Sequence, residues 1–205
     1  MTRFSIAVIA GDGVGPEVIA AGKRVLERVA ERFDFELAFE EFPWGSEYYF
    51  RHGRMMPPGA LELLQAHDAI YLGAVGHPDI PDHVTLNGLL LPIRRGFDLY
   101  VNLRPAVLYE GVSSPLAGRQ AGEIDLAIVR ENTEGEYAPI GGFLYHQQPE
   151  EVAVQTAVFT RRGVERVVRF AFELALKRRR RLASITKSNA QAYGMVLWDR
   201  VFQAV

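Results

Sequence analysis

Short apolar runs and helical patterns alternate along the whole chain. The apolar runs predict strands at residues 4–10, 35–42, 69–76, 99–109, 125–132 and 182–189. Apolar positions at helical spacing predict helices at residues 16–33, 59–67, 85–97 and 163–177, with one more beginning at residue 190. This alternation is typical of an α/β fold in which helices flank a largely parallel sheet.

Two of these helices contain a proline with a defined effect. Pro16 occupies the first helical position of 16–33, where its missing N–H costs nothing. Pro92 lies inside 85–97 and predicts a kink or a break there. The predicted apolar face of the first helix consists of Val18, Ile19, Val25, Leu26, Val29 and Phe33.

In residues 139–160 the pattern of apolar and polar positions is less regular than in the rest of the chain. Residues 139–151 predict a loop or a projecting arm, and residues 152–160 alternate in the way of an exposed or edge strand. A division near residue 100 would separate a first α/β domain, residues 1–100, from a second domain, residues 101–205.

Composition excludes several classes of protein. The 205 residues carry a net charge of −2 and no cysteine, which removes disulfides, thiol nucleophiles and thiolate metal sites. The balanced charge gives no reason to expect nucleic acid or an acidic membrane as a partner. No segment approaches the length of a membrane span, and the N-terminal apolar run is too short for a secretory signal. We therefore expect a soluble, cytoplasmic protein.

The segment GDGVGPE, residues 11–17, follows the first predicted strand. A Rossmann turn requires G-x-G-x-x-G, but Gly11, Gly13 and Gly15 are two apart, and Pro16 stands where the third glycine belongs. No Gly-Lys-Ser/Thr follows, so the segment is not a P-loop. Spacing alone favours a tight turn that leads into a helix, with a backbone that can approach a ligand.

Three arginines lie near the ends of predicted elements. Arg94 is near a helix end, Arg104 closes one strand, and Arg130 ends another. Ligands collect at the carboxyl ends of strands in open α/β sheets, and guanidinium binds carboxylate with two hydrogen bonds. The arginines therefore suit a substrate with two carboxylates. The alternative is that they are surface residues paired with the nearby acidic side chains, Glu131, Glu134 or Glu136.

Two other residues are candidates for proton transfer. Lys187 lies at the end of the predicted strand 182–189, where burial would lower its pKa and make it available as a base. Tyr137 is a candidate proton donor, although tyrosine is far more often a packing residue.

Two charged clusters are interpreted as structural. HPDIPDH, residues 77–83, contains two histidines and two aspartates, but its prolines and irregular spacing favour a loop over a metal site. KRRRR, residues 177–181, falls at a predicted helix C-terminus, where cations complement the helix dipole.

Four motifs resemble those of one enzyme family. GDGVGPE, IRRGFDLYVNLRP, VRENTEGEY and ITKSNA occur in the order and approximate spacing of the β-decarboxylating dehydrogenases, which include isocitrate, isopropylmalate, D-malate and tartrate dehydrogenases. The resemblance runs over the whole chain, and WGSEYYFRHGRMMP and GAVGHPDIPDHVTL resemble the tartrate/D-malate branch. It implies the isocitrate/isopropylmalate dehydrogenase-like fold, with GDGVGPE beside the nicotinamide end of NAD.

The resemblance also implies roles for individual residues. Arg94, Arg104 and Arg130 match the arginines that bind the carboxylates of a malate-like substrate. Tyr137 matches the tyrosine that protonates the enolate after carbon dioxide leaves. Lys187 matches the lysine that assists deprotonation of the substrate hydroxyl from the partner subunit. The remaining matched positions are Leu90 and Leu91 for the third substituent of the substrate, and Gly13, Val14, Asn87 and Asn189 for NAD.

The implied reaction is NAD-dependent oxidation and β-decarboxylation of tartrate or D-malate by a homodimer with an arm at residues 139–160. The implied ions are Mg²⁺ or Mn²⁺, as a Lewis acid, and potassium. Family members are longer, and their metal-binding aspartates and adenosine loop follow the position of Val205. We therefore expect the chain to be incomplete at its C-terminus, to hold no metal ligand and to be inactive alone. The alternatives are 3-isopropylmalate dehydrogenase, because Leu90 and Leu91 can line an apolar pocket, and a non-catalytic fragment able only to dimerise.

Overall fold

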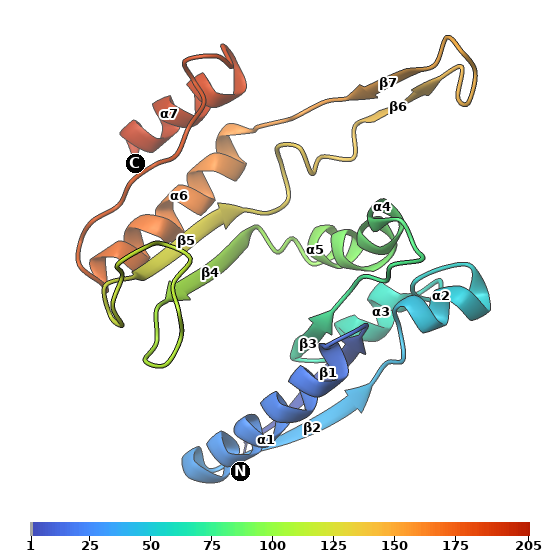
Figure 1. The fold of residues 1–205 in the computed structure, drawn as a ribbon, viewed down its shortest axis with the longest axis vertical. Helices are drawn as coiled ribbons and strands as arrows, with labels where there is room; N and C mark the ends of the chain where they lie inside the picture. The colour runs from blue at the N-terminus through green and yellow to red at the C-terminus, as the bar shows by residue number, and fades with distance from the viewer. Residues whose placement is uncertain (1) are drawn as a thin grey trace. The chain divides into compact units, whose positions relative to one another are not determined.

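The computed structural model describes residues 2–205, which divide after Phe97 into two compact units (Figure 1). The first unit contains β1 (Thr2–Gly11), α1 (Gly15–Phe33), β2 (Phe35–Glu41), α2 (Ser46–His52), α3 (Ala60–Gln65), β3 (Ala69–Ala74), α4 (Asp82–Thr85), the π-helix η1 (Leu86–Leu90) and α5 (Leu91–Gly96). The second unit contains β4 (Val101–Val107), β5 (Asp125–Glu131), β6 (Gly141–Leu144), β7 (Val152–Gln155), α6 (Arg161–Leu176) and α7 (Gly194–Ala204). No helix within residues 2–205 is long and apolar enough to cross a membrane.

The first unit is built on a parallel sheet in the order β2-β1-β3. β1 is the central strand, and its consecutive residues Ala7, Val8 and Ile9 are all fully buried. Successive side chains of a strand point to opposite faces, so both faces of β1 are covered. A strand in that position needs a continuous apolar run, as SIAVIA provides. The predicted α/β class, with a parallel sheet and flanking helices, is confirmed.

α1 buries fewer apolar residues than its sequence offers. Ile19 is buried as predicted, and Gly22 allows close approach to β3, because a Cβ there would lie 1.7 Å from the Tyr71 hydroxyl oxygen. Leu26 is half-buried, and four other positions of the predicted apolar face are exposed: Val18 by 50%, Val25 by 63%, Val29 by 37% and Phe33 by 66%. The apolar stripe is wider than the surface that the three strands cover, so the predicted buried face is wrong for these four side chains.

The main apolar cluster of the first unit joins the sheet to α3, η1 and α5. Its buried members are Ala7, Ile9, Phe42, Trp44, Met55, Ala60, Leu64, Leu89 and Ile93. α2 was not predicted from the sequence. It is only two turns long, too short for a helical apolar period, and it begins after Gly45, whose φ of 143° few other residues adopt.

The helical segment 82–96 changes its hydrogen-bonding pattern at the centre. α4, η1 and α5 follow one another directly, and the N–H of Leu91 donates to the carbonyl of Leu86, five residues back. Pro92 has no N–H to continue the ordinary ladder. The irregularity predicted at Pro92 is therefore a π-helix immediately before it rather than a break, and such π segments are frequent at functional sites.

In the second unit, β4 and β5 form an antiparallel pair, α6 packs on one face of the pair, and α7 packs against α6 (Figure 1). The buried core consists of Val164, Val167, Val168 and Val201. α6 begins two residues before the predicted helix because Thr160 caps it, with the Thr160 hydroxyl accepting from the N–H of Gly163 at 3.0 Å.

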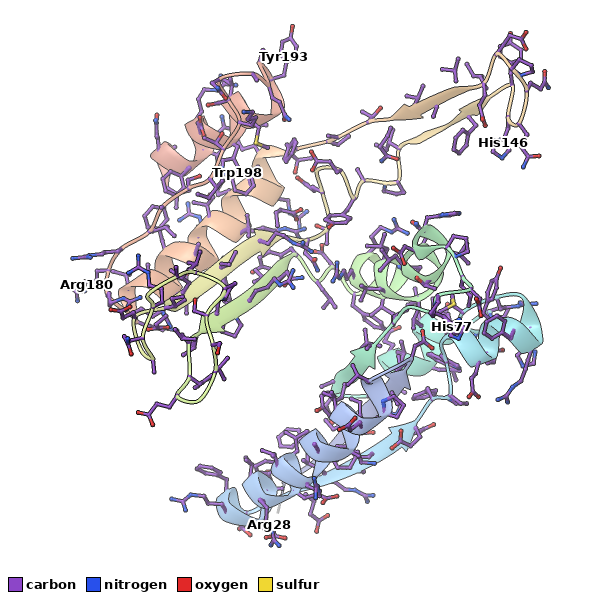
Figure 2. The ribbon with its side chains drawn as sticks, in the orientation of Figure 1. Arg28, His77, His146, Arg180, Tyr193 and Trp198 are labelled. Atoms are coloured by element: carbon purple, nitrogen blue, oxygen red, sulfur yellow. The ribbon has the colours of Figure 1, made fainter. Side chains whose placement is uncertain are left out.

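The predicted strand at residues 182–189 is wrong. Residues 181–187 are irregular, and residues 188–190 form a turn. The indole N–H of Trp198, labelled on α7 in Figure 2, donates to the hydroxyl of Ser184 at 2.9 Å. The segment is thus held by a side chain of α7 rather than by a neighbouring strand.

A hairpin of β6 and β7 projects with His146 near its tip (Figure 2). The edge strand predicted at 152–160 is present as the shorter β7. Residues 139–151 were predicted as a loop or a projecting arm; the structure shows the arm, because β6 lies inside this segment and pairs with β7. β6 has four residues, two of which are glycines, so its alternation is not visible in the sequence, whereas that of β7 is. Every residue of both strands is exposed.

Candidate functional site

The GDGVGPE turn is held in place by a buried aspartate. The Asp12 carboxylate accepts hydrogen bonds from the N–H and hydroxyl of Ser46, both at 2.7 Å, and from the N–H of Gly76 at 2.9 Å. Asp12 therefore joins three segments that follow the carboxyl ends of β1, β2 and β3. Gly11 and Gly15 pack so closely that a Cβ would lie 2.0 Å and 2.1 Å from backbone carbonyl oxygens.

Gly13 and Val14 form the exposed tip of this turn. Gly13 has a φ of +54°, and no atom lies within 4 Å of the position of its missing Cβ. Val14 is 58% exposed, and the N-terminus of α1 has no side-chain cap. The two residues predicted to contact NAD thus lie where a ligand can reach the backbone, whereas Gly11 and Gly15 are packing residues.

The π-helix and α5 carry four further predicted site residues. Asn87 is exposed, and its amide N–H donates to the carbonyl of His83 at 2.8 Å. Leu90, Leu91 and Arg94 are half-buried. All four belong to the first unit, on one continuous helical segment.

Arg104 and Arg130 lie on the same face of the β4-β5 pair. Val101 and Val129 pack against the α6 core, and alternation therefore directs Arg104 and Arg130 to the opposite face. Arg130 pairs with Asn102, two residues from Arg104, so the two arginines are diagonal neighbours with Cα atoms about 7–8 Å apart. The register thus brings together two arginines that are 26 positions apart in the sequence.

Arg130 lies over Tyr137, and its charge has no acidic partner within residues 2–205. The centre of its guanidinium is 5.3 Å from the centroid of the Tyr137 ring. Its Nε is buried and makes no hydrogen bond within residues 2–205. In the same range neither Arg104 nor Arg130 forms an ion pair. The sequence left open the alternative that these arginines pair with neighbouring glutamates. For Arg104 and Arg130 that alternative is therefore wrong.

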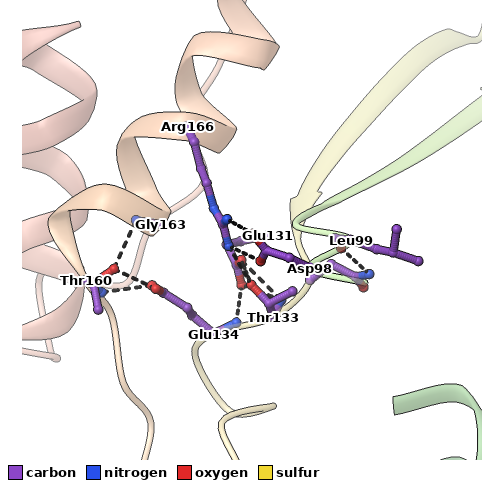
Figure 3. Close-up of polar contacts among 9 residues, drawn as sticks. Asp98, Leu99, Glu131, Thr133, Glu134, Thr160, Gly163 and Arg166 are labelled. Atoms are coloured by element: carbon purple, nitrogen blue, oxygen red, sulfur yellow. Dashed lines mark hydrogen bonds and ion pairs between the residues drawn. The ribbon is translucent and has the colours of Figure 1, made fainter. Parts of the chain in front are cut away.

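The nearby glutamates have other partners (Figure 3). The Glu131 carboxylate accepts from the N–H and hydroxyl of Thr133 and, at 2.6 Å, from the N–H of Glu134. The Glu134 carboxylate accepts from the N–H and hydroxyl of Thr160 at 2.8 and 2.6 Å. Arg166 of α6 donates to Thr133 at 3.1 Å. We call these five residues, Glu131, Thr133, Glu134, Thr160 and Arg166, the loop clamp.

Arg166 also forms a bidentate ion pair with Asp98. Its Nη1 and Nη2 donate to the two carboxylate oxygens at 2.5 and 2.8 Å. The hydrogen bond to the Arg166 guanidinium lowers the pKa of Asp98, and the same bond raises the pKa of Arg166. Arg166 lies 4.5 Å from the centroid of the Tyr100 ring, which holds it from one side.

We expect Asp98→Asn to destabilise the second unit at neutral pH but not in acid. Because the folded-state pKa of Asp98 is lowered, its stabilisation is complete above its ordinary value of 3.8 and disappears as the pH falls through the lowered value. The Asp98 side chain is 61% exposed, so screening limits the effect to about 1 kcal/mol or less. Urea unfolding of both proteins at several pH values measures it, and an equal loss at all of them would contradict the ion-pair explanation.

Lys187 and Asn189 are both exposed. The burial predicted for Lys187 from a strand is therefore absent in this chain, because the strand itself is absent. An exposed position leaves both side chains free to contact a second molecule.

The two clusters that were interpreted as structural have local partners. In 77–83, the Asp79 N–H donates to the His77 ring at 3.2 Å, and α4 begins at Asp82. In 177–181, Arg178 contacts the Asp125 carboxylate at 2.7 Å, and Arg179 lies 3.5 Å from the same carboxylate. Within residues 2–205, no group of three or more histidine and acidic side chains is arranged to hold a metal ion.

Sequence reasoning missed Asp12 and the loop clamp. Asp12 had a local signal, because an aspartate at a glycine turn after a buried strand commonly accepts backbone hydrogen bonds. Thr160 also had one, since threonine three residues before Gly163 matches a helix cap. The contact between Glu134 and Thr160 spans 26 residues and left no local signal.

A family model described as isocitrate/isopropylmalate dehydrogenase matches residues 5–205. D-malate dehydrogenase [decarboxylating] of Escherichia coli (strain K12) is 54% identical over 208 residues, covering 100% of this chain and 58% of the relative. Tartrate dehydrogenase/decarboxylase of Pseudomonas putida is 49% identical over 205 residues, covering 98% of this chain and 56% of the relative. The chain thus spans a little over half the length of the curated relatives it matches.

Solved structures agree in fold. Isocitrate dehydrogenase from Methylococcus capsulatus superposes with a TM-score of 0.78 at 27% identity, covering 100% of this chain and 56% of that one. A β-decarboxylating dehydrogenase from Thermococcus kodakarensis in its apo form superposes with a TM-score of 0.62 at 33% identity, covering 100% of this chain and 54% of that one.

Proposed function

The chain belongs to the isocitrate/isopropylmalate dehydrogenase family, and on that premise we propose that it takes part in the NAD-dependent oxidation and β-decarboxylation of D-malate or tartrate. The choice of substrate is supported by the names of its relatives, which are 49–54% identical to it. The activity, the substrate and the partners of the full-length protein are all parts of this proposal.

One observation carries the proposal. Arg104 and Arg130 share one sheet face and have no acidic partner within residues 2–205. An unpaired guanidinium whose Nε is already shielded from water is disfavoured unless an anion contacts it. Arg130 is such a group, and the exposed Arg104 lies at the diagonal position on the same face. Together the two arginines match a small molecule with two carboxylates. We propose Arg94, in the first unit, as a third carboxylate contact.

Tyr137 and Lys187 are the proposed proton-transfer groups. NAD, when bound, would supply the acceptor for the hydride from C2 of the substrate. The Lys187 amine takes the proton of the C2 hydroxyl. The bond from C3 to its carboxylate then breaks, carbon dioxide leaves, and the electron pair remains as an enolate. The Tyr137 hydroxyl, beside Arg130, donates a proton to that carbon. The exposure of Lys187 in its own chain supports action on a second subunit.

The residues of the first unit fit a contact with NAD. Gly13 offers open backbone, Val14 is exposed, and the Asn87 side chain has a carbonyl oxygen without a partner in residues 2–205. We propose these residues, with Asn189, as cofactor contacts, and Leu90 and Leu91 as contacts to the third substituent of the substrate.

The described residues do not fit a divalent metal site. Residues 2–205 contain no suitable group of histidine and acidic side chains. No residue of this chain is therefore proposed as a ligand to Mg²⁺, Mn²⁺ or potassium, and no step above passes through a metal ion.

A substrate panel tests the proposal. NADH formation by the full-length gene product is measured with D-malate, tartrate, 3-isopropylmalate and the monocarboxylate D-lactate. Because an arginine without its carboxylate loses a charge-assisted contact, kcat/KM for D-lactate should be lower by about 30-fold or more. Equal rates with D-lactate would overturn the proposed dicarboxylate site. A preference for 3-isopropylmalate would overturn the choice of D-malate or tartrate.

We expect the full-length protein to be a homodimer that uses the hairpin of β6 and β7. Phe143, Leu144, Val152 and Val154 are exposed by 60%, 60%, 44% and 52%. A lone two-stranded hairpin is marginal in water, and its apolar side chains and edges are a liability unless they are covered. Light scattering at micromolar concentration should give a dimer, and Phe143→Asp with Val154→Asp should give a monomer. Val112→Asp, at an exposed loop residue, is the control, and a wild-type monomer would contradict the expectation.

A further inference from the structure

Glu134 and Arg166 hold the segment that joins Arg130 to Tyr137. We propose that both are positioning residues, which fix this segment on α6 and thereby keep the Arg130 guanidinium and the Tyr137 hydroxyl in place for a bound dicarboxylate. The inference rests on the proposed function for the identity of the ligand. The contacts that support it lie entirely in the second unit (Figure 3).

Glu134 is attached at both its backbone and its side chain. Its N–H donates to Glu131, and its carboxylate accepts two hydrogen bonds from Thr160, the cap of α6. The fit is close, because a Cβ on Gly163 would lie 2.3 Å from the Glu134 carboxyl group. The negative charge at the first turn of α6 is also favoured by the helix dipole. Glu134 therefore connects the segment to the start of α6.

Arg166 attaches the same segment one turn further along α6. Arg166 donates to the Thr133 hydroxyl and forms the bidentate ion pair with Asp98, which precedes β4. The charges of Glu131 and Glu134 act on it in addition to that of Asp98. Loss of Arg166 would leave three carboxylates near one another without their cation, and their repulsion would loosen the segment.

The ends of the clamped segment are the proposed site residues. Arg130 directly precedes Glu131, and Tyr137 follows Glu134 by three residues. Gly135 is also held, by a hydrogen bond from its N–H to the Val158 carbonyl at 2.7 Å. The cation–π contact between Arg130 and Tyr137 therefore closes a short segment whose middle is fixed on α6. Release of the middle would allow the two ends to move apart.

The test compares Arg166→Met with Arg169→Met in the full-length gene product. Arg169 lies on the same helix and, within residues 2–205, pairs only with Glu165, so it is a matched control. In Arg166→Met we expect faster amide exchange at Thr133 and Glu134 and a fall in kcat/KM for D-malate of up to about 100-fold, normalised to folded protein. Arg169→Met should match the wild type in both. Arg166→Lys should be intermediate, because lysine lacks the planar fork.

Glu134→Gln and Glu136→Gln form a second pair, in case Arg166→Met does not fold. Glu136 is exposed, and its side chain makes no hydrogen bond or ion pair within residues 2–205. We expect a smaller fall in kcat/KM for Glu134→Gln and none for Glu136→Gln. If Glu134→Gln and Arg166→Met both kept wild-type kcat/KM despite faster amide exchange, the loop clamp would have only a structural role, and the proposal would be overturned. Unchanged amide exchange in both variants would overturn it too.

A spectroscopic readout separates this inference from the proposed function. The ring signals of Tyr137 in tyrosine-labelled protein can be assigned as those that disappear in Tyr137→Phe. Release of the ring from Arg130 should shift these signals in Arg166→Met and not in Arg169→Met. If the wild type turned over no dicarboxylate, the proposed function would fail, and the positioning role would then be decided by this shift. An unchanged signal would overturn it.

Discussion

Replacement of Tyr137 by phenylalanine is expected to slow the conversion of D-malate to its decarboxylated product by about 10²–10⁴-fold. The substitution removes only the hydroxyl, which is the proposed proton donor. The aromatic ring stays, and so does the cation–π contact with Arg130 at 5.3 Å. The fold and the carboxylate contacts should therefore be preserved, so that the loss appears mainly in kcat.

The step that slows can be identified with pre-steady-state kinetics. If hydride transfer is intact and protonation is slow, Tyr137→Phe should release one equivalent of NADH rapidly and then turn over slowly. Tyr109→Phe is the control, because Tyr109 is 67% exposed and lies outside the site. Wild-type turnover by Tyr137→Phe would show that Tyr137 is a packing residue and not the proton donor.

Arg130→Ala is expected to cost about 2–5 kcal/mol in kcat/KM for D-malate, the range for truncation of one partner of a desolvated charge pair. The physical reason is that Arg130 has a buried Nε and no acidic partner within residues 2–205, so its guanidinium is available to bind a ligand carboxylate. A substrate carboxylate that loses this contact remains near the site without its counter-charge. Thermal unfolding should change much less than kcat/KM, because Arg130 forms no ion pair within residues 2–205 that could be lost.

Arg119→Ala is the control for that measurement. Arg119 is also in the second unit, but its side chain is 55% exposed and lies 3.9 Å from Glu123. It should leave kcat/KM unchanged. If Arg130→Ala retained wild-type kcat/KM for D-malate, Arg130 would not be a substrate contact, and the sheet face shared with Arg104 would lose its proposed role.

The elements that could be predicted from the sequence are those whose pattern is set locally. β1 needs a continuous apolar run because both its faces are covered, and α6 has a regular apolar stripe and a threonine cap. The disturbance before Pro92 follows from a missing N–H. Arg130 lies next to the end of β5, as predicted, whereas the prediction that Arg104 closes a strand is wrong, because Arg104 lies at the centre of β4. The face that the two arginines share depends on the register of β4 and β5, which no local pattern indicates.

The errors have a common physical cause, which is that burial depends on partners distant in the sequence. Residues 182–189 have strand composition, but they pair with no strand within residues 2–205, and Ile185 is 87% exposed. Val25 and Phe33 have helical spacing, but the three-stranded sheet does not cover them. Likewise, no local pattern indicates that Glu134 binds Thr160 instead of an arginine.

The stoichiometry of carbon dioxide to NADH during oxidation of D-malate tests the central claim most directly. It is measured with the full-length gene product, by trapping carbon dioxide from labelled D-malate while NADH absorbance is followed. If Arg104, Arg130 and Tyr137 serve a β-decarboxylating oxidation, one carbon dioxide should be released for each NADH formed. NADH without carbon dioxide, or neither product from D-malate or tartrate, would contradict the account.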